Sequence, residues 1–107
     1  MALLKGTLDV LVLKTLSWGP MHGYEITCWL ERQSGRRLAF TDAALLQALH
    51  RLEEQQLLAA SWGETSNGRR ARYYKMTTAG RSHLRAESAA LLDQFAALAN
   101  VLAVSTR

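Results

Sequence analysis

The sequence contains few of the residues that cross-link or break a chain. Among its 107 residues there are one cysteine, Cys28, and one proline, Pro20. A single cysteine excludes an internal disulfide framework and is typical of a reducing compartment, so we expect a cytoplasmic protein. The apolar amino-terminal stretch is interrupted by Lys5, Asp9 and Lys14, so we expect neither a signal peptide nor a membrane-spanning helix.

Residue groupings typical of catalysis or metal binding are also missing from the sequence. His22, His50 and His83 fall on different predicted elements, and their spacing from one another and from Cys28 is not that of metal ligands. There is no phosphate-binding loop, no carboxylate pair and no nucleophile beside a base. We therefore predict a protein that is not an enzyme and that uses no metal and no cofactor.

Acidic residues are missing from residues 65–86, although this segment is rich in basic ones. The whole chain has 13 Lys and Arg residues, 9 Asp and Glu residues and a formal net charge of +4. The basic residues of the segment are Arg69, Arg70, Arg72, Lys75, Arg81 and Arg85. Because the positive charge is concentrated locally, it indicates an acidic partner more than general solubility.

Three helices are predicted in the first half of the chain, whose length fits a single domain. Thr7 is the expected cap of the first helix, which ends at the sequence WGPMHG. The second helix runs from about His22 to Ser34, and Thr41 caps the third, TDAALLQALHRLEEQQ. The apolar stripe of the third helix, which should face the core, comprises Leu45, Ala48, Leu49 and Leu52.

The stretch LLAASWGETSNGRRARYYKMT is predicted to be a β-hairpin. Asn67 and Gly68 tolerate the positive φ of a two-residue type I′ turn, which is the strongest short hairpin signal. If the strands close there, Trp62 faces Tyr73 as an aromatic cross-strand pair. A longer loop that begins at Glu64 would shift this register.

Apolar residues recur at spacings of three and four in the last helix, which Thr78 should cap and which should end near Val104. The stripe comprises Leu84, Ser88, Leu91, Phe95, Leu98 and Leu102. It could fold back over the core, or it could pair with a second copy of the chain. A helix of about 25 residues, rising about 1.5 Å per residue, would extend past a small three-helix body, which favours the homodimer.

The order of three helices and a hairpin predicts a mainly α fold with a small β-hairpin. We interpret residues 1–77 as a winged helix-turn-helix DNA-binding domain and residues 78–107 as a long C-terminal dimerisation helix of the same structural unit. In this architecture the third helix enters the major groove of double-stranded DNA, and the hairpin, or wing, reaches the flanking backbone. A two-fold dimer would place two such heads on a pseudo-palindromic operator.

The candidate DNA contacts lie on the third helix and on the wing. The wing arginines can replace counterions along phosphates. Gln47 can pair with an adenine edge, and Leu46 can touch a thymine methyl group. A charged surface strand and a plain core helix are the alternative interpretations of the two elements. The candidates are Thr41, Ala43, Leu46, Gln47, His50 and Arg51 on the helix, and Asn67, Gly68, Arg69, Arg70 and Arg72 on the wing.

The three tryptophans, Trp18, Trp29 and Trp62, leave two interpretations open. They can line a pocket for a ligand between two subunits, or they can fill the core and an interface, as such residues commonly do.

Three segments together resemble the PadR-type transcriptional regulators. They are LLKGTLDVLVLKTLSWGPMHGYEI (residues 3–26), ALHRLEEQQLLAASWGETSNGRRARYYKMTTAGR (residues 48–81) and the closing helix. The sequence is most similar to the short subgroup that has a single C-terminal helix, and the resemblance covers almost the whole chain.

The resemblance implies a homodimeric winged-helix DNA-binding regulator, usually a repressor, that responds to a small aromatic or lipophilic effector. It places His22, Gly23 and Tyr24 near the DNA backbone at the start of the second helix. It assigns the wing tip to DNA as well. The dimer contacts that it implies are Leu91, Phe95, Leu98 and Leu102 on the last helix, assisted by Leu4 and Leu8 on the first; Leu84 extends the same stripe.

One stretch departs from the family pattern. Where the family has a start similar to GSLYPAL in its recognition helix, this chain has AALLQAL at residues 43–49. Ala44, Leu46 and Gln47 replace a small hydroxyl residue, a tyrosine and a proline. Because two polar groups that would face DNA are replaced, three alternatives stay open: a different operator, a reduced affinity, or a dimeric protein–protein adaptor or antagonist that reads no DNA. The three tryptophans add a further alternative, a sensor of small hydrophobic molecules.

Overall fold

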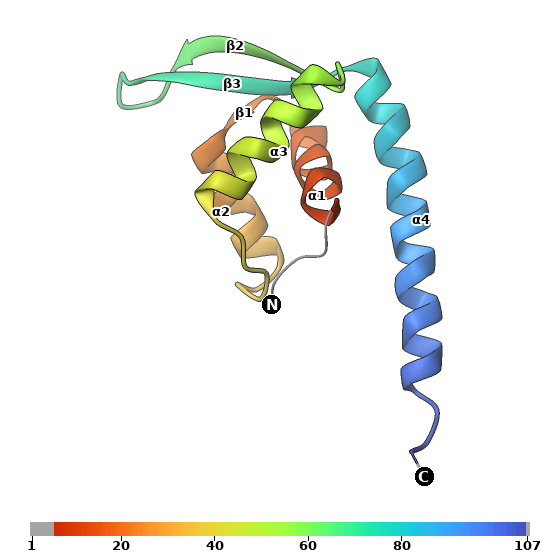
Figure 1. The fold of residues 1–107 in the computed structure, drawn as a ribbon. Helices are drawn as coiled ribbons and strands as arrows, with labels where there is room; N and C mark the ends of the chain where they lie inside the picture. The colour runs from red at the N-terminus through yellow and green to blue at the C-terminus, as the bar shows by residue number, and fades with distance from the viewer. Residues whose placement is uncertain (1–5, 107) are drawn as a thin grey trace.

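The structure, a computed structural model, describes residues 6–106 and is mostly helical with a small three-stranded antiparallel sheet (Figure 1). The elements are α1 (Thr7–Thr15), a short 3₁₀ helix (Leu16–Trp18), β1 (Met21–His22), α2 (Gly23–Gln33), α3 (Asp42–Glu54), β2 (Leu58–Glu64), β3 (Arg70–Met76) and α4 (Thr78–Leu102). This is the predicted winged helix-turn-helix with a long C-terminal helix. Within the described residues, none of the helices is long and apolar enough to cross a membrane.

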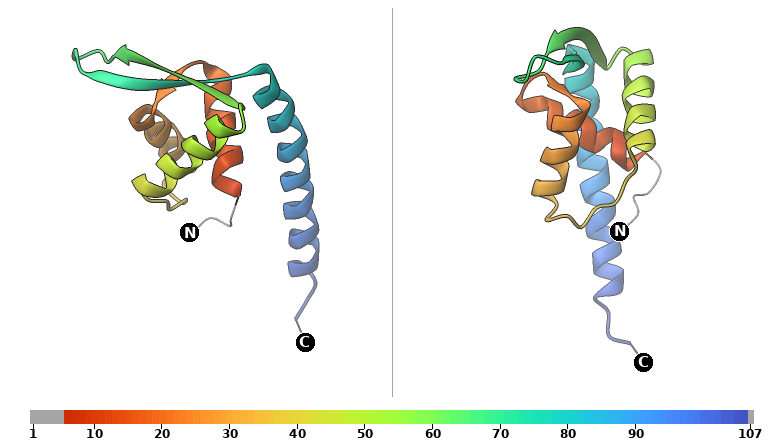
Figure 2. Two further views of the ribbon diagram at one scale, coloured as in Figure 1. Left: turned by 45° about the horizontal axis from the view of Figure 1, so that its top comes forward. Right: turned by 90° about the vertical axis from the view of Figure 1, so that its left-hand side faces the viewer.

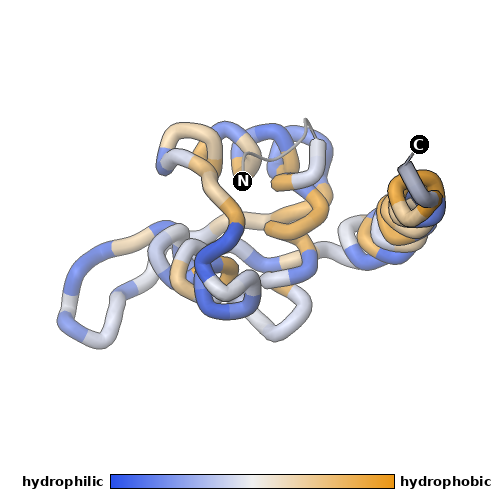
Figure 3. Tube along the Cα trace, turned by 90° about the horizontal axis from the view of Figure 1, so that it is seen from below, coloured by the Kyte–Doolittle hydropathy of each residue, from blue (hydrophilic) through white to orange (hydrophobic). Residues whose placement is uncertain are grey.

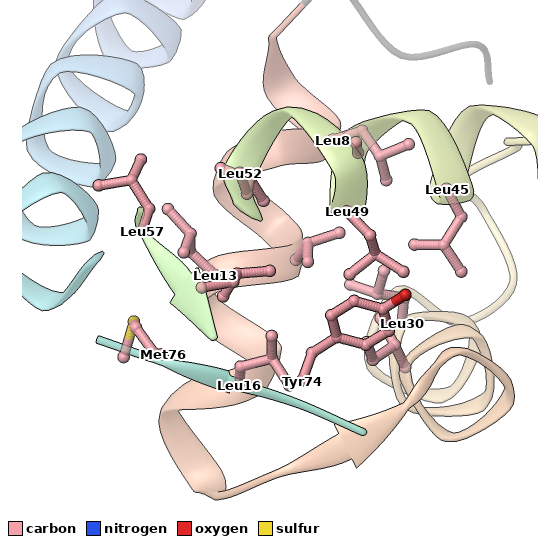
Figure 4. Close-up of a cluster of buried hydrophobic side chains, with 14 residues drawn as sticks. Leu8, Leu13, Leu16, Leu30, Leu45, Leu49, Leu52, Leu57, Tyr74 and Met76 are labelled. Carbon is pink, nitrogen blue, oxygen red and sulfur yellow. The ribbon is translucent and has the colours of Figure 1, made fainter. Parts of the chain in front are cut away.

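A single apolar core lies between α1, α2, α3 and the base of the sheet (Figure 4). Val12, Leu13 and Ile26 are completely buried in it. Each large apolar side chain that leaves water on folding contributes about 1.5–3 kcal/mol, so these contacts fix how the three helices lie against one another. The stripe predicted for the third helix is confirmed, since Leu45, Ala48, Leu49 and Leu52 are all at most 5% exposed.

The starts of α2 and α3 are fixed by side-chain caps. The His22 Nδ1 atom accepts a hydrogen bond from the Glu25 backbone N–H (3.3 Å), and the Glu25 carboxylate accepts one from the His22 N–H (3.1 Å), which makes a capping box. The Thr41 hydroxyl oxygen accepts a hydrogen bond from the Ala44 N–H (3.0 Å), as predicted. These caps fix the positions at which the two helices meet.

The two caps predicted at Thr7 and Thr78 are wrong by one residue. Gly6, with a φ of 86°, occupies the N-cap of α1, and Thr7 is a buried residue inside the helix. At α4 the cap is Thr77, whose hydroxyl accepts a hydrogen bond from the Gly80 N–H (3.0 Å) and donates one to the Gln56 carbonyl (2.8 Å). Thr77 rather than Thr78 caps α4 because only its hydroxyl has this second partner, at the end of α3.

The register predicted for the hairpin is also wrong by one residue. Trp62 is paired with Arg72 and not with Tyr73. The connection is the longer loop: the Thr65 N–H donates to the Arg69 carbonyl (2.7 Å) and the Gly68 N–H donates to the Thr65 carbonyl (3.0 Å). Within this loop, only Gly68 has a positive φ (81°), which fits a three-residue hairpin loop closed by a left-handed glycine.

The second half of α4 stands clear of the body (Figures 1 and 2). Leu84, near its start, packs against the core. Further along, Phe95 is 44% exposed, Leu98 48% and Leu102 82%. Viewed end-on, α4 is separate from the three-helix body and has hydrophobic residues along its length (Figure 3). The second half of the helix therefore has apolar side chains that the rest of residues 6–106 leaves exposed.

Gly80 gives the first stability prediction, because α4 meets the start of β2 there without room for a side chain. A Cβ atom on Gly80 would lie 2.2 Å from the Leu57 carbonyl oxygen. We expect Gly80→Ala to lower the free energy of unfolding by about 1–3 kcal/mol, measured by chemical denaturation. The matched control is Gly23→Ala, where a Cβ would meet nothing within 4 Å and the change should stay within about 0.5 kcal/mol. If Gly80→Ala instead stabilised the protein, as alanine does at an ordinary helical glycine, the close packing would be disproved.

Candidate nucleic-acid interface

The predicted DNA contacts of α3 are on its solvent side. Thr41, Ala43, Gln47 and His50 are exposed, and Leu46 is 50% exposed although it is a large apolar residue. They lie opposite the buried stripe of the same helix, because a residue three or four positions along returns to the same face. Apart from Arg51, the candidates on the outward face of α3 are therefore apolar and neutral polar side chains.

Arg51 is an exception among the α3 candidates, because its guanidinium has a partner within the chain. Its Nη2 lies 2.7 Å from one carboxylate oxygen of Asp9, and its Nε lies 3.2 Å from the other. This two-pronged hydrogen bond joins α3 to α1, and it raises the pKa of Arg51 above its usual value. A phosphate contact by Arg51 would have to compete with Asp9. Because Arg51 and Asp9 are far apart in the sequence, no local pattern could have indicated this ion pair.

Arg72 also has an acidic partner, on the side of the wing that faces α3. Its Nη2 lies 2.8 Å from a carboxylate oxygen of Glu53. The guanidinium carbon of Arg72 is 5.8 Å from the centre of the Trp62 ring, and that of Arg70 is 4.7 Å from it. Trp62 thus holds two arginines on one face of the wing, each by a contact of about 0.5–1 kcal/mol at such an exposed site.

At the tip of the wing, the positive charge without an acidic partner among the described residues is on Arg69 and Arg70. Both side chains are exposed, and no carboxylate within residues 6–106 forms an ion pair with either of them. Asn67 and Gly68, also exposed, form the tip beside them. The structure therefore keeps two of the four predicted arginines in ion pairs and leaves the two nearest the wing tip free for an external anion.

The opposite face of the wing is attached to the start of α2 through Tyr73. Its ring meets the His22 ring edge-on, with 5.3 Å between the ring centres. Its hydroxyl donates a hydrogen bond to the Glu64 carbonyl (3.0 Å). A Cβ atom on Gly63 would lie 3.0 Å from the ring, so only glycine lets Tyr73 lie this close to β2. Tyr73 and Gly63 were not predicted site residues, because the contact between them depends on the strand register that the structure corrects.

A hollow of about 490 Å³ opens between α2 and α3. It is lined by Gly23, Tyr24, Thr27, Asp42, Leu45, Leu46 and Leu49. Tyr24 is 69% exposed, and its pKa is raised, first by a hydrogen bond with Cys28 one turn along α2. The two candidates Tyr24 and Leu46 thus come together at the mouth of one mainly apolar hollow.

The predicted dimer contacts divide into two groups. Leu8 is only 8% exposed and belongs to the core of its own chain, and Leu84 and Leu91 are partly buried. Phe95, Leu98 and Leu102 are exposed, whereas Leu4 lies outside the described residues. The exposed members of the predicted dimer set therefore lie on the second half of α4.

Comparison with known proteins gives one family and one fold. A model described as the transcriptional regulator PadR-like family matches residues 12–86. A PadR family transcriptional regulator from Eggerthella lenta DSM 2243 is 28% identical, with a TM-score of 0.76 over 94% of this chain and 86% of that one. A PadR family transcription regulator from Clostridium difficile R20291 is 25% identical, with a TM-score of 0.74 over 91% of this chain and 99% of that one.

Bacillus subtilis PadR, whose crystal structure includes operator DNA, is similar in fold alone. It is 19% identical to this chain, with a TM-score of 0.66 over 75% of this chain and 45% of that one.

The contact between Arg51 and Asp9 can be tested without a ligand. In a double-mutant cycle of Asp9→Asn and Arg51→Gln, we expect a coupling free energy of about 0.2–1 kcal/mol in chemical denaturation, because the pair is two-pronged but partly exposed. Glu54→Gln, an exposed acid on the same helix, is the control and should change stability by less than about 0.5 kcal/mol. A coupling energy of zero would mean that Arg51 is free to turn toward another partner.

Proposed function

This chain belongs to the PadR-like family of transcriptional regulators, and from that premise we propose that it is a sequence-specific DNA-binding repressor that acts as a homodimer. The family consists of transcriptional regulators, so the chain is a regulator and not an enzyme. The operator complex of Bacillus subtilis PadR, which has the same fold, supports double-stranded DNA as the partner. We place the protein in the cytoplasm, where such a regulator meets the chromosome.

The observation that carries the proposal is the pair of free arginines at the wing tip. Arg69 and Arg70 are exposed, have no acidic partner among residues 6–106, and lie in a segment without acidic residues. Phosphates of a duplex are the anions that such a finger can follow, and displacement of their counterions would supply most of the affinity. Base edges would then be met by Ala43, Gln47 and His50 on α3.

The homodimer is proposed from the apolar stripe on α4. Phe95, Leu98 and Leu102 are exposed on a helix that already extends beyond the body, and pairing with a second copy would remove them from water. A two-fold axis through this contact would present two wings and two copies of α3 to one duplex. The matching operator is pseudo-palindromic.

Repression would follow from occupation of the operator, and an effector would act by changing the distance between the two reading heads. A small lipophilic or aromatic compound is the effector class that we propose from the family resemblance. Only a compound that binds one arrangement of the dimer better than the other can shift the equilibrium between them. Two tryptophans remain available to report such binding, since Trp18 is 72% exposed and Trp62 58% exposed.

A second candidate function is favoured by the apolar residues on the reading face. Tyr24 and Leu46 are both at least half exposed, which suits a protein partner as well as DNA. The chain would then be a dimeric adaptor or antagonist without a conventional operator. Retention of a specific protein in a pull-down, with no retention of genomic DNA fragments, would favour this function over the first.

The wing assignment predicts a change in the salt dependence of DNA binding. Fragments selected from genomic DNA by the purified protein would be titrated at several salt concentrations. Replacing Arg69 and Arg70 by alanine should flatten the plot of log affinity against log salt concentration by about 0.9 for each phosphate that is no longer neutralised. Replacing Arg81 and Arg85 by alanine, the same loss of two charges at exposed positions of α4, should leave the slope as it is. Equal slopes for all three proteins would remove the wing from the interface.

The dimer assignment predicts that a charge on the α4 stripe separates the subunits. We expect the unmodified protein to sediment as a dimer and Leu98→Glu to sediment as a monomer, because a buried unpaired carboxylate is costly. Ala97→Glu is the matched control, since position 97 is exposed and is turned about 100° from Leu98, away from the apolar stripe, and it should remain a dimer. Dissociation by both variants, or by neither, would contradict an interface at Leu98.

A further inference from the structure

We propose that the hollow between α2 and α3, bordered by Leu46 and Tyr24, recognises the C5-methyl groups of thymines in the operator. The inference rests on the proposed function, because it takes DNA as the partner and names what the reading helix selects in it.

The recognition helix α3 has no cationic side chain free to contact a base. Arg51 is the only Lys or Arg between Asp42 and Glu54, and both of its hydrogen-bonding prongs are directed to Asp9. An arginine or lysine that reaches guanine is the commonest specific contact in the major groove. Because α3 has no such side chain to spare, this guanine contact is not open to it, and neutral and apolar groups make up most of its candidate contacts.

The exposed apolar surface of the expected reading face surrounds the hollow between α2 and α3. Leu46 is 50% exposed in the middle of α3, and Tyr24 is 69% exposed at the start of α2. Both border the hollow of about 490 Å³, and Leu45 and Leu49, which are nearly buried, complete its apolar lining. Large apolar side chains are commonly withdrawn from water, so such a cluster on the expected reading face indicates an apolar group in the partner.

The major groove of DNA offers one apolar group that suits this hollow. Among the base edges that the major groove presents, the thymine methyl is the apolar group, and adenine, guanine and cytosine present donors and acceptors. Among residues 6–106, Asp42 is the only charged side chain that lines the hollow, and its negative charge repels phosphate and so disfavours the DNA backbone as the occupant. The thymine methyl fits the hollow, and the exposed Gln47 beside Leu46 can hydrogen-bond the adenine of an A·T pair.

The test removes methyl groups from DNA without changing any hydrogen bond. In an operator selected by the protein, thymines of each half-site are replaced by deoxyuridine one position at a time, and affinities are measured at fixed salt. Burial of one methyl contributes about 0.8 kcal/mol, which is a factor of about four in affinity. We expect a loss of that size per half-site at one or more thymines, hence about fifteenfold when both half-sites are changed.

The protein variants show which side chain reads the methyl. Leu46→Ala should bind the unmodified operator more weakly and should lose its preference for thymine over deoxyuridine at that position. Glu54→Ala, an exposed residue about two turns further along α3 that is not a proposed DNA contact, is the control and should keep the preference. Because Leu46 is half exposed, the variant is expected to fold, and thermal unfolding of both variants would verify this.

Three results would overturn the inference. Binding that ignores deoxyuridine at every half-site position would refute methyl recognition while leaving DNA binding intact. An undiminished preference in Leu46→Ala would show that another side chain reads the methyl. Failure of the unmodified protein to select any DNA would overturn the inference together with the proposed function, and Leu46-dependent binding of a hydrophobic dye would then identify the hollow as a small-molecule site.

Discussion

Gly68 has a φ of 81° and closes a three-residue loop, and this backbone geometry sets the pairing of β2 with β3. Side chains alternate between the faces of a strand, so a shift of one residue would exchange the two faces relative to the partner strand. In the observed pairing, Tyr74 and Met76 enter the core near the base of the hairpin. Further out on the same face, Trp62 meets Arg70 and Arg72. The same pairing of β2 with β3 therefore places side chains in the core at the base of the hairpin and sets the contacts of Trp62 further out.

The four arginines proposed as DNA contacts on α3 and the wing have two different physical tasks. Arg51 and Arg72 are bound to Asp9 and Glu53, and these pairs connect α3 to α1 and to the wing. Arg69 and Arg70 have no such acid among residues 6–106 and remain available at the end of the hairpin. A side chain held by an internal carboxylate would give up that ion pair on meeting a phosphate, whereas Arg69 and Arg70 have no ion pair within the described residues to give up. Affinity is therefore expected at the wing tip and selectivity on the neutral face of α3.

Local patterns in the sequence were sufficient for the helices and for the core stripe of α3, because caps and apolar periodicity act within a few residues. Thr41 is such a case, since its hydroxyl bonds a neighbour three residues away. The hairpin register was not predictable from Asn67 and Gly68, because the same pair suits a two-residue turn and a three-residue loop that uses only one positive φ. The pairing of Arg51 with Asp9 spans 42 positions and leaves no local signal. The hollow between α2 and α3 likewise depends on how two helices pack.

The end of α3 and the start of α4 are connected closely enough that one can position the other. The Thr77 hydroxyl bonds the Gln56 carbonyl, the Thr77 N–H donates to the Leu57 carbonyl (3.1 Å), and Gly80 lies directly against Leu57. A packed contact of this kind transmits displacement as a rigid unit because it has no space to deform. In the proposed homodimer, a rotation of α4 against its partner would therefore carry α3 with it. An effector between the subunits would need no contact with the wing or with α3 to change the spacing of the two reading helices on DNA.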